Sequence, residues 1–187
     1  MSQTALLIID MQADMQHRID AGYDHVHGDA GTVITRLAEH ARWAGVPVIH
    51  VRHSETDPAS PFHPSAPGYL PLPCDREQPG EAVFVKTSSS AFATTGLEAH
   101  LRQNGIDRLI VTGAVAGFCV TSTVRAASDL GFQVTVVREA VLGFGLPHAG
   151  LSARQIFDVS LGLLAADFSQ VVDADAALAL IGAFATP

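Results

Sequence analysis

Cysteine is scarce in this chain, whose 187 residues include only Cys74 and Cys119. Two thiols cannot form the disulfide framework on which small secreted domains depend. No secretory signal is recognised either, because the apolar stretch near the N-terminus is short and is interrupted by Asp10. We therefore expect the protein to keep free thiols in a reducing, cytoplasmic environment.

Positive charge is also scarce. Lys and Arg total 11 against 19 Asp and Glu, which gives a formal net charge of -8 at pH 7. Nucleic-acid phosphates and anionic membranes require clustered Lys and Arg, so the sequence predicts neither as a partner. No apolar run approaches the roughly 20 residues of a transmembrane helix, and the chain has no repeats. Its 48% hydrophobic content suits one domain over residues 1–187.

Strand-like and helix-like patterns alternate along the chain, which is typical of a parallel sheet with helices on both faces. Strand-like runs lie at residues 4–10, 46–52, 83–86, 108–114, 133–137 and 170–172. Helical patterns lie at residues 33–41, 96–104, 120–130, 151–166 and 174–183. We therefore predict a three-layer α/β/α, Rossmann-like fold on an open parallel sheet of about six strands.

Residues 53–81 interrupt this alternation. They hold seven of the ten prolines and show no sustained periodicity. A loop this long inside a compact domain usually has a function or is disordered. Because it follows the second strand, it could close over a pocket as a lid; a solvated loop or a subunit contact fits equally well. The apolar side chains of Phe62, Tyr69 and Leu70 favour a packed loop.

Cys119 lies where an apolar run meets glycines and then a helix-like segment, in VTGAVAGFCVT at residues 111–121. This pattern is typical of a strand-to-helix elbow that presents a thiol. A helix N-terminus lowers a thiol pKa, because its free N–H groups favour the thiolate, which is the nucleophilic form. The segment thus predicts a nucleophile, which a disulfide with Cys74 would disable, although an ordinary buried thiol also fits.

Two charged residues end other strand-like runs. Asp10 follows apolar residues 5–9, and Lys86 follows apolar residues 82–85. In an open parallel sheet, ligands bind outside the carboxyl ends of the strands. Asp10, Lys86 and Cys119 would converge there as base, cation and nucleophile. Taken singly, Asp10 could be a cap or turn residue and Lys86 a solvated strand end. The combination of these two residues with Cys119 favours a catalytic site.

These motifs resemble those of the isochorismatase-like cysteine hydrolases, a family that includes nicotinamidases and N-carbamoyl amidohydrolases. The resemblance rests on LLIIDMQ at 6–12, VKTSSSAF at 85–92 and GAVAGFCV at 113–120, and continues to Thr123, Ala127, Gly131 and Phe132. It implies that Asp10, Lys86 and Cys119 form a catalytic triad. It also implies a cis peptide between Ala114 and Val115, which would turn the Val115 N–H toward the substrate oxygen beside the Cys119 N–H as an oxyanion hole.

The chemistry expected of such a triad is hydrolysis of a C–N bond in a small amide or ureido compound. Asp10 would take the Cys119 proton, Lys86 would stabilise the thiolate, and a thioester would form as ammonia or an amine departs. Many relatives carry Thr-Asp where this chain has Ala116-Gly117, a departure that bears on the substrate more than on the triad. The resemblance also implies a homo-oligomer, either a homodimer or a homotetramer.

Gln12, Phe92, Phe118 and Phe144 are candidates for the substrate pocket. The three aromatic rings would favour a small planar or apolar substrate, while core packing explains each ring taken alone. His148, which follows a proline, could line the pocket or cap a helix.

Two other functions remain open. One is vinyl-ether hydrolysis of isochorismate, but relatives that catalyse it commonly lack the cysteine, so Cys119 argues against it. The other is a non-catalytic or redox-sensing protein in which the thiol is merely oxidisable, against which Asp10 and Lys86 argue.

A metal site is not expected. Nicotinamidase-type relatives carry an Asp-x-His pair after the second strand, whereas Asp57 here precedes Pro58. His53 and His63 could share a metal with Glu55, but scattered surface histidines are commoner than ligands. The glycines at 113 and 117 are not followed by the Lys-Ser/Thr of a phosphate loop. We expect no cofactor and a small-molecule substrate.

Overall fold

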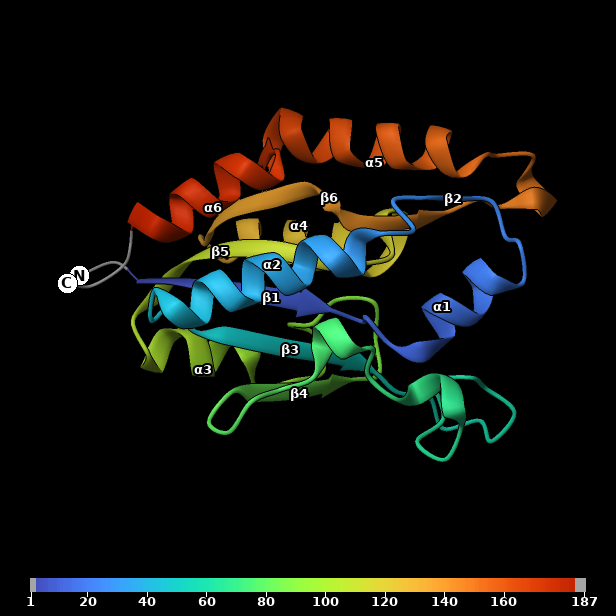
Figure 1. The fold of residues 1–187 in the computed structure, drawn as a ribbon, viewed down its shortest axis with the longest axis horizontal. Coiled ribbons are helices and arrows are strands. Elements are labelled where there is room, and N and C mark those ends of the chain that lie inside the picture. Colours follow the sequence, from blue (N-terminus) through green and yellow to red (C-terminus); the bar gives the residue numbers. More distant parts are fainter. Residues whose placement is uncertain (1–2, 184–187) are drawn as a thin grey trace.

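The computed structural model describes residues 3–183, which fold around a central β-sheet (Figure 1). Within these residues the strands are β1 (Gln3–Ile9), β2 (His25–Val26), β3 (Val48–His53), β4 (Ala82–Lys86), β5 (Ile106–Ala114), β6 (Gln133–Phe144) and β7 (Gln170–Val172). The α-helices are α1 (Ala13–Asp20), α2 (Ala30–Trp43), α3 (Leu97–Gln103), α4 (Thr121–Asp129), α5 (Ala153–Asp167) and α6 (Ala174–Ala183). The outermost ends of the predicted domain, residues 1–2 and 184–187, lie outside the described part.

The strands follow the order β2-β6-β5-β1-β3-β4, with β7 also paired to β6. All pairings are parallel except that of β2 with β6. The predicted fold class is therefore confirmed, and the six predicted parallel strands are joined by a seventh, antiparallel one. No helix within residues 3–183 has the length and apolar character needed to span a membrane.

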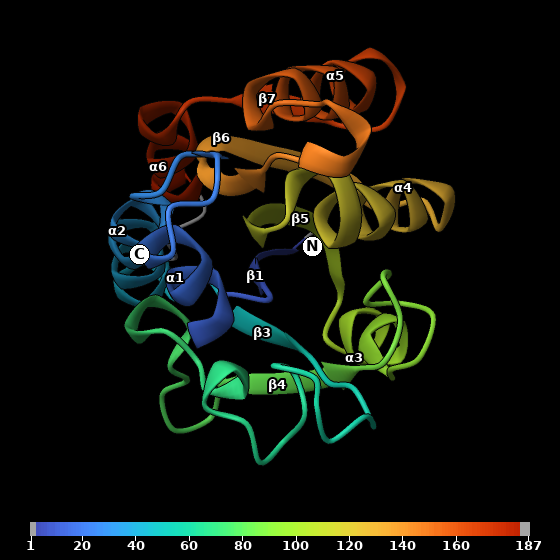
Figure 2. The ribbon, with the colours of Figure 1, turned by 90° about the vertical axis from the view of Figure 1, so that its right-hand side faces the viewer.

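The sheet is covered on both faces (Figure 2). Along β1, Leu7 and Ile9 pack with the apolar side chains of α3, α4 and α5. Leu6 and Ile8 point to the opposite face and pack with α1, α2 and α6. Successive side chains of a strand point to opposite faces, so a strand covered on both faces is apolar throughout, as β1 is.

Three features differ from the sequence-based expectation. The fifth predicted strand does not end at residue 137 but continues as β6 to Phe144, across a register irregularity opposite β5. Arg138 and Glu139 interrupt its apolar pattern there, as residues at a bulge commonly do. Helix α1 and strand β2 were not predicted, because α1 buries only Asp14 and Met15 and therefore has no apolar stripe.

The central strand β1 has β3 on one side and β5 on the other, so the chain reverses the direction of its winding at this point. The crevice at such a switch point is where open α/β sheets bind ligands. Strands β1 and β5 approach each other closely at their carboxyl ends, where Gly113 pairs with Ile9. Gly113 has φ +118°, and a Cβ there would lie 2.1 Å from the Ile9 carbonyl oxygen. Only glycine fits this position.

The proline-rich segment 53–81 packs against the edge of the sheet and α1. The Ala13 N–H donates to the Leu70 carbonyl (2.7 Å), and the Leu72 N–H donates to the Met11 carbonyl (2.8 Å). Cys74 and Asp75 are buried further along the segment, whereas Leu70 is exposed. The favoured packed loop is therefore what the structure contains.

Candidate active site

The three predicted catalytic residues meet at the switch point, where Lys86 contacts the other two. Its Nζ lies 2.7 Å from Asp10 Oδ2 and 3.2 Å from Cys119 Sγ. Asp10 and Lys86 are buried, and Cys119 is partly exposed. A carboxylate, an ammonium group and a thiol that come from three distant parts of the sequence thus meet in one cluster.

The local backbone explains how the cluster forms. Asp10 directly follows β1 with φ +51°, a left-handed conformation that Asp adopts more readily than most residues, and its N–H donates to the Val51 carbonyl (2.8 Å). Lys86 ends the edge strand β4, two strands away, and only a long side chain can reach back past β3 to the end of β1. Cys119 lies in a single π-helical turn, Ala116–Val120, between β5 and α4.

Burial controls the protonation of the cluster. It raises the pKa of Asp10, and the Lys86 ammonium opposes this shift. Burial, reinforced by the charge of Asp10, raises the pKa of the Cys119 thiol to about 12. The expectation of a thiol pKa lowered by a helix N-terminus is therefore wrong, because desolvation of the thiolate outweighs the favourable charge of Lys86. The resting nucleophile is a neutral thiol that needs a base.

Asp10 can serve as that base. Its Oδ2 is paired with Lys86 and its Oδ1 is buried, and a side-chain hydrogen bond between Asp10 and Cys119 is among the causes of the pKa shifts of both groups. A carboxylate within hydrogen-bond reach of the thiol is placed to accept its proton.

His53 is a fourth member of the cluster. Its Nδ1 lies 3.3 Å from Lys86 Nζ, and its Nε2 lies 3.1 Å from Glu55 Oε1. An ammonium group only donates, so Nδ1 accepts and Nε2 carries the proton that is donated to Glu55. The sequence had suggested His53 only as a metal ligand. Its register opposite Lys86 in the β3–β4 pair is the signal that could have placed it here.

The turn before Cys119 contains the cis peptide between Ala114 and Val115 that the family resemblance implied. The Val115 carbonyl accepts hydrogen bonds from the N–H groups of Phe118 (2.9 Å) and Val120 (3.4 Å), which closes the turn. Ala116 is buried, and a Cβ at Gly117 would lie 2.8 Å from Ile156 Cγ2. Helix α5 therefore occupies the space that a larger side chain at position 117 would need.

A cavity of about 600 Å³ adjoins this turn. It is lined by Arg18, Gly22, Tyr23, Asp24, Val115, Phe118, Phe144, Gly145, Leu146, Pro147 and His148. Phe118 and Phe144 thus lie where the sequence predicted a substrate pocket. His148, which the sequence allowed as a pocket residue, also lines the cavity, whereas the lining residues from the end of α1 and the link that follows it carried no sequence signal.

Two predicted pocket residues have other roles. Phe92 stacks on Phe132, with ring centroids 5.7 Å apart, and does not line the cavity. Gln12 is fully buried, and its amide is used in three hydrogen bonds to the backbone of His53 and Tyr69. Phe92 is thus partly buried against the core, and Gln12 fixes the backbone beside the cluster of Asp10, Lys86 and Cys119.

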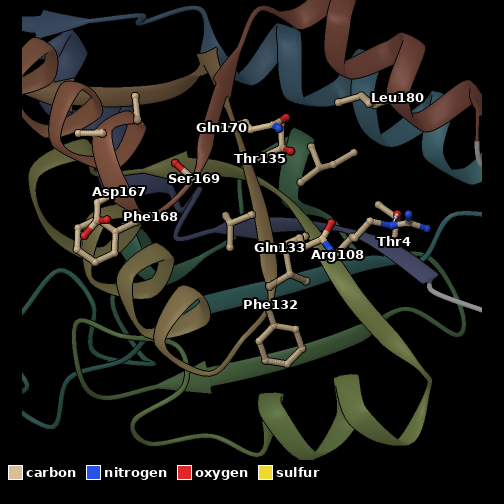
Figure 3. A pocket seen from close by; sticks show the side chains of 15 residues that line it. Thr4, Arg108, Phe132, Gln133, Thr135, Asp167, Phe168, Ser169, Gln170 and Leu180 are labelled. Atoms are coloured by element: carbon tan, nitrogen blue, oxygen red, sulfur yellow. Dashed lines mark hydrogen bonds between the residues drawn. The ribbon is translucent and has the colours of Figure 1, made fainter.

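A second cavity, of about 650 Å³, lies at the opposite edge of the sheet (Figure 3). Thr4, Arg108, Gln133 and Gln170 line it from the amino ends of four strands. Neither cavity is lined by Asp10, Lys86 or Cys119 themselves, but the first is lined by Val115, Phe118 and Phe144, whereas the second is lined by none of the predicted site residues. The cavity beside Val115 and Phe118 is therefore the candidate substrate site.

Metal ligands do not cluster at the candidate site. Residues 3–183 contain no group of three His, Cys, Asp or Glu placed to hold an ion. His53 and Glu55 are in contact, but His63 Nδ1 bonds to Ser65 Oγ (2.8 Å) within its own turn. Cys74 and Cys119 are unpaired thiols.

The fold and the cluster define a three-layer α/β protein with a carboxylate, an ammonium group and a thiol at its switch point. Residues 4–176 match the Isochorismatase domain family. The chain belongs to this family and is an isochorismatase-family hydrolase, as the sequence motifs predicted.

Individual relatives agree with this assignment. The isochorismatase family protein YrdC of Bacillus subtilis is 28% identical over 174 residues, which cover 91% of this chain and 92% of that protein. The ureidoacrylate amidohydrolase RutB of Variovorax paradoxus is 31% identical over 192 residues, covering 84% and 75%. The N-carbamoylsarcosine amidase of an Arthrobacter species is 36% identical over 125 residues, covering 58% and 47%. A crystal structure described as a hydrolase of the isochorismatase family, from Chromobacterium violaceum, has a TM-score of 0.89 at 33% identity, covering 97% of this chain and 94% of that one.

Proposed function

We propose that this hydrolase cleaves a C–N bond of a small amide or ureido compound through a thioester on Cys119. The observation that carries the proposal is the position of Lys86 Nζ, within hydrogen-bond distance of both Asp10 and Cys119. The similarity to RutB and to N-carbamoylsarcosine amidase supports C–N hydrolysis, because both are amidohydrolases by name.

The first half-reaction begins with a neutral thiol. Asp10 accepts the Cys119 proton as sulfur adds to the substrate carbonyl carbon, and Lys86 lies beside the sulfur as negative charge develops. The N–H groups of Val115 and Cys119 are the proposed donors to the oxyanion, a contribution of roughly 3–4 kcal/mol per donor in comparable sites. Protonated Asp10 then returns its proton to the leaving nitrogen, the C–N bond breaks, and a thioester remains.

The second half-reaction consumes one water. Asp10, now ionised again, accepts a proton from that water as its oxygen adds to the thioester carbonyl. The C–S bond breaks, the thiolate recovers the proton from Asp10, and the acid is released. Each half-reaction returns Asp10 to its starting state, so one carboxylate acts as base and acid twice per turnover.

The two alternative functions predict different behaviour of the cluster. An isochorismate hydrolase would need no thiol, and the contact between Lys86 and Cys119 disfavours that reading. A redox sensor would need an easily formed thiolate, whereas burial raises the pKa of Cys119 to about 12. Both observations favour amide hydrolysis.

Ammonia release from a panel of ureido acids, simple amides and nicotinamide tests the proposal. Wild type is compared with Cys119→Ala and with Cys74→Ser, which removes the other thiol, and isochorismate is assayed in parallel. Turnover that is lost in Cys119→Ala and kept in Cys74→Ser supports a cysteine amidohydrolase. Isochorismate turnover that survives Cys119→Ala would sink the proposal.

We also propose that the protein is a homo-oligomer, a homodimer or a homotetramer, in the cytoplasm. Val159 and Leu163 lie one turn apart on α5 and are 62% and 52% exposed, which is the kind of apolar surface that a second copy could cover. Light scattering after size exclusion measures the mass directly. A monomer at micromolar concentration would contradict this proposal.

A further inference from the structure

Arg18 provides a positive charge in the wall of the candidate substrate cavity. It lies on α1, opposite the turn that carries Val115 and Phe118, and all three residues line the same cavity of about 600 Å³. The family resemblance and the triad chemistry leave the role of Arg18 unexplained, since neither requires a guanidinium group there.

The guanidinium group is held in place but is only partly used. Arg18 Nε donates to Asp14 Oδ2 at 2.7 Å, an ion pair four residues apart on α1. Its Cζ lies 5.9 Å from the ring centroid of Phe62 and 5.8 Å from that of Phe144. Arg18 Nη1 and Nη2 have no hydrogen-bond partner among residues 3–183. A fixed guanidinium with two free amino groups is suited to a carboxylate, which it binds through parallel hydrogen bonds.

Arg18 is also close to the catalytic cluster. Phe62, which Arg18 contacts on one side, lies edge-on to the His53 ring with centroids 5.3 Å apart. His53 in turn contacts Lys86. The charge of Arg18 contributes to lowering the pKa of Glu55, the carboxylate bound to His53, after the larger effects of Ser60 and His53 itself. Arg18 shares its cavity with Val115 and Phe118, which belong to the turn that carries Cys119, so a substrate in this cavity could contact Arg18 beside that turn.

Two carboxylates near Arg18 could repel an anion, but each already has a hydrogen-bond partner. Asp14 is mostly buried and neutralises part of the Arg18 charge through Nε alone. Asp24 Oδ2 accepts a hydrogen bond from the Ala153 N–H at the start of α5 (2.7 Å). The positive end of this helix stabilises the Asp24 charge. His148, a possible further donor, lines the same cavity.

We propose that Arg18 binds the carboxylate of an anionic substrate, so that the hydrolysed compound is a small amide or ureido acid. This inference rests on the proposed function for the identity of the scissile bond, but not for the presence of an anion subsite. Arg18 would act as a specificity-determining residue, which holds one end of the substrate while the carbonyl carbon lies at Cys119.

Charge-selective alkylation of Cys119 tests the subsite without any turnover. Iodoacetate and iodoacetamide transfer nearly equal groups to a thiol, but only iodoacetate carries a carboxylate. Mass spectrometry of the tryptic peptide that contains Cys119 gives both rates, and their ratio cancels any change in thiol reactivity. We expect Arg18→Met to lower the iodoacetate-to-iodoacetamide ratio about tenfold, the value of one charge-assisted hydrogen bond.

Two variants serve as controls. Arg18→Lys keeps the charge but not the parallel hydrogen bonds, so it should keep only part of the ratio, and Arg36→Met removes an exposed cation of α2 that does not line the cavity. An equal ratio in Arg18→Met and wild type overturns the proposal, as does an equal fall in Arg36→Met. Circular dichroism identifies a misfolded variant, in which case Arg18→Gln replaces Arg18→Met.

A second measurement separates failure of the subsite from failure of the proposed function. N-carbamoylglycine and its methyl ester differ only in the carboxylate. Arg18→Met should raise KM for the acid about tenfold and leave that of the ester unchanged. Equal effects on both compounds overturn the subsite. Absence of hydrolysis of every amide tested, with an alkylation ratio that still depends on Arg18, would reject the hydrolysis and retain the anion subsite.

Discussion

The side-chain amide of Gln12 both accepts a hydrogen bond from the backbone of His53 and donates one to it. Gln12 Oε1 accepts from the His53 N–H at 2.8 Å, and Gln12 Nε2 donates to the His53 carbonyl at 3.0 Å. The same Nε2 donates to the Tyr69 carbonyl at 2.9 Å. Gln12 lies two residues after Asp10. Its hydrogen bonds therefore fix His53 and the proline-rich segment 53–81 in position relative to Asp10.

Replacing Gln12 by Leu should therefore damage both stability and activity. Three partly buried backbone groups would lose a partner, and an unsatisfied buried group costs about 1–3 kcal/mol. We expect a lower free energy of unfolding in urea together with a lower kcat, since His53 would no longer be fixed. Gln16→Leu, on the exposed face of α1, is the matched control. A Gln12→Leu enzyme with wild-type stability would show that the hydrogen bonds are dispensable.

His53 should act as a positioning residue for Lys86. His53 Nδ1 accepts one of the three N–H groups of the Lys86 ammonium. The other two N–H groups are then directed to Asp10 and Cys119. Loss of a hydrogen bond to a charged group corresponds to about 10–100-fold in rate, so His53→Ala should lower kcat by that factor with little change in KM.

Rescue distinguishes positioning from general structural support. The Asn side chain can place an acceptor oxygen close to the position of His Nδ1, so His53→Asn should recover part of the lost kcat. Equal losses in His53→Ala and His53→Asn, accompanied by equal losses of stability, would contradict the positioning role.

The pH dependence of the reaction should follow Asp10 and not the thiol. Asp10 must be ionised to accept the proton, and burial raises its pKa. The value of kcat/KM should therefore rise with pH through that raised pKa and then remain level, because a thiol with a pKa of about 12 gives no second increase near neutrality. Asp10→Asn should remove the rise and lower kcat/KM by about 10²–10⁴-fold. A profile that rises with a pKa of 8 to 9 would indicate direct thiolate attack and reject this base.

The meeting of Asp10, Lys86 and Cys119 could be predicted because these residues mark the ends of strands. Asp10 and Lys86 each terminate an apolar run, and Cys119 follows one, so strand topology alone brings them to one edge of the sheet. Their protonation could not be predicted. Whether a helix N-terminus or burial dominates a thiol pKa depends on how much surrounding chain excludes water, and that is a property of the packed structure.

The wall of the candidate cavity that contains Arg18 and Asp24 could not be predicted, for a different reason. Arg18 lies on α1, which has no apolar stripe, and Asp24 lies in the link to β2, a strand of two residues. Strand β2 pairs with the end of β6 and thereby brings this link beside Phe144. Neither element has a sequence pattern, so long-range pairing, and not local propensity, forms this wall of the cavity.

The buried pair of His50 and Asp75 should make stability depend on pH. His50 Nδ1 lies 2.7 Å from Asp75 Oδ1, with both side chains fully buried. Burial raises the pKa of Asp75 from 3.8 to about 6. Burial alone would lower the pKa of His50, but its contacts with Asp75 and Glu81 raise it above 6.5. For both groups the folded chain holds its proton more tightly than the unfolded chain does.

The direction of the effect follows from this. The stabilisation from Asp75 is full below pH 3.8 and is lost as the pH rises through about 6. The stabilisation from His50 is full below pH 6.5 and is lost as the pH rises through the raised pKa of that residue. The free energy of unfolding should therefore fall by roughly 1–3 kcal/mol between pH 4 and pH 8. Asp75→Asn should flatten this slope, and Asp20→Asn, at the exposed end of α1, should not. An unchanged slope in Asp75→Asn would contradict the assignment.

Two glycine-to-alanine substitutions should have opposite effects on stability. At Gly113, between β5 and β1, the added Cβ would lie 2.1 Å from the Ile9 carbonyl oxygen, with φ at +118°. The clash is with backbone that cannot move without parting the two central strands, so we expect a loss above about 4 kcal/mol, or no folded protein. At Gly162, inside α5, no atom lies within 4 Å of the added Cβ. Alanine there should stabilise the helix by about 0.5–1 kcal/mol. Urea unfolding of both variants measures the difference, and a Gly113→Ala chain that folds with near wild-type stability would show that β1 and β5 can separate at the active edge.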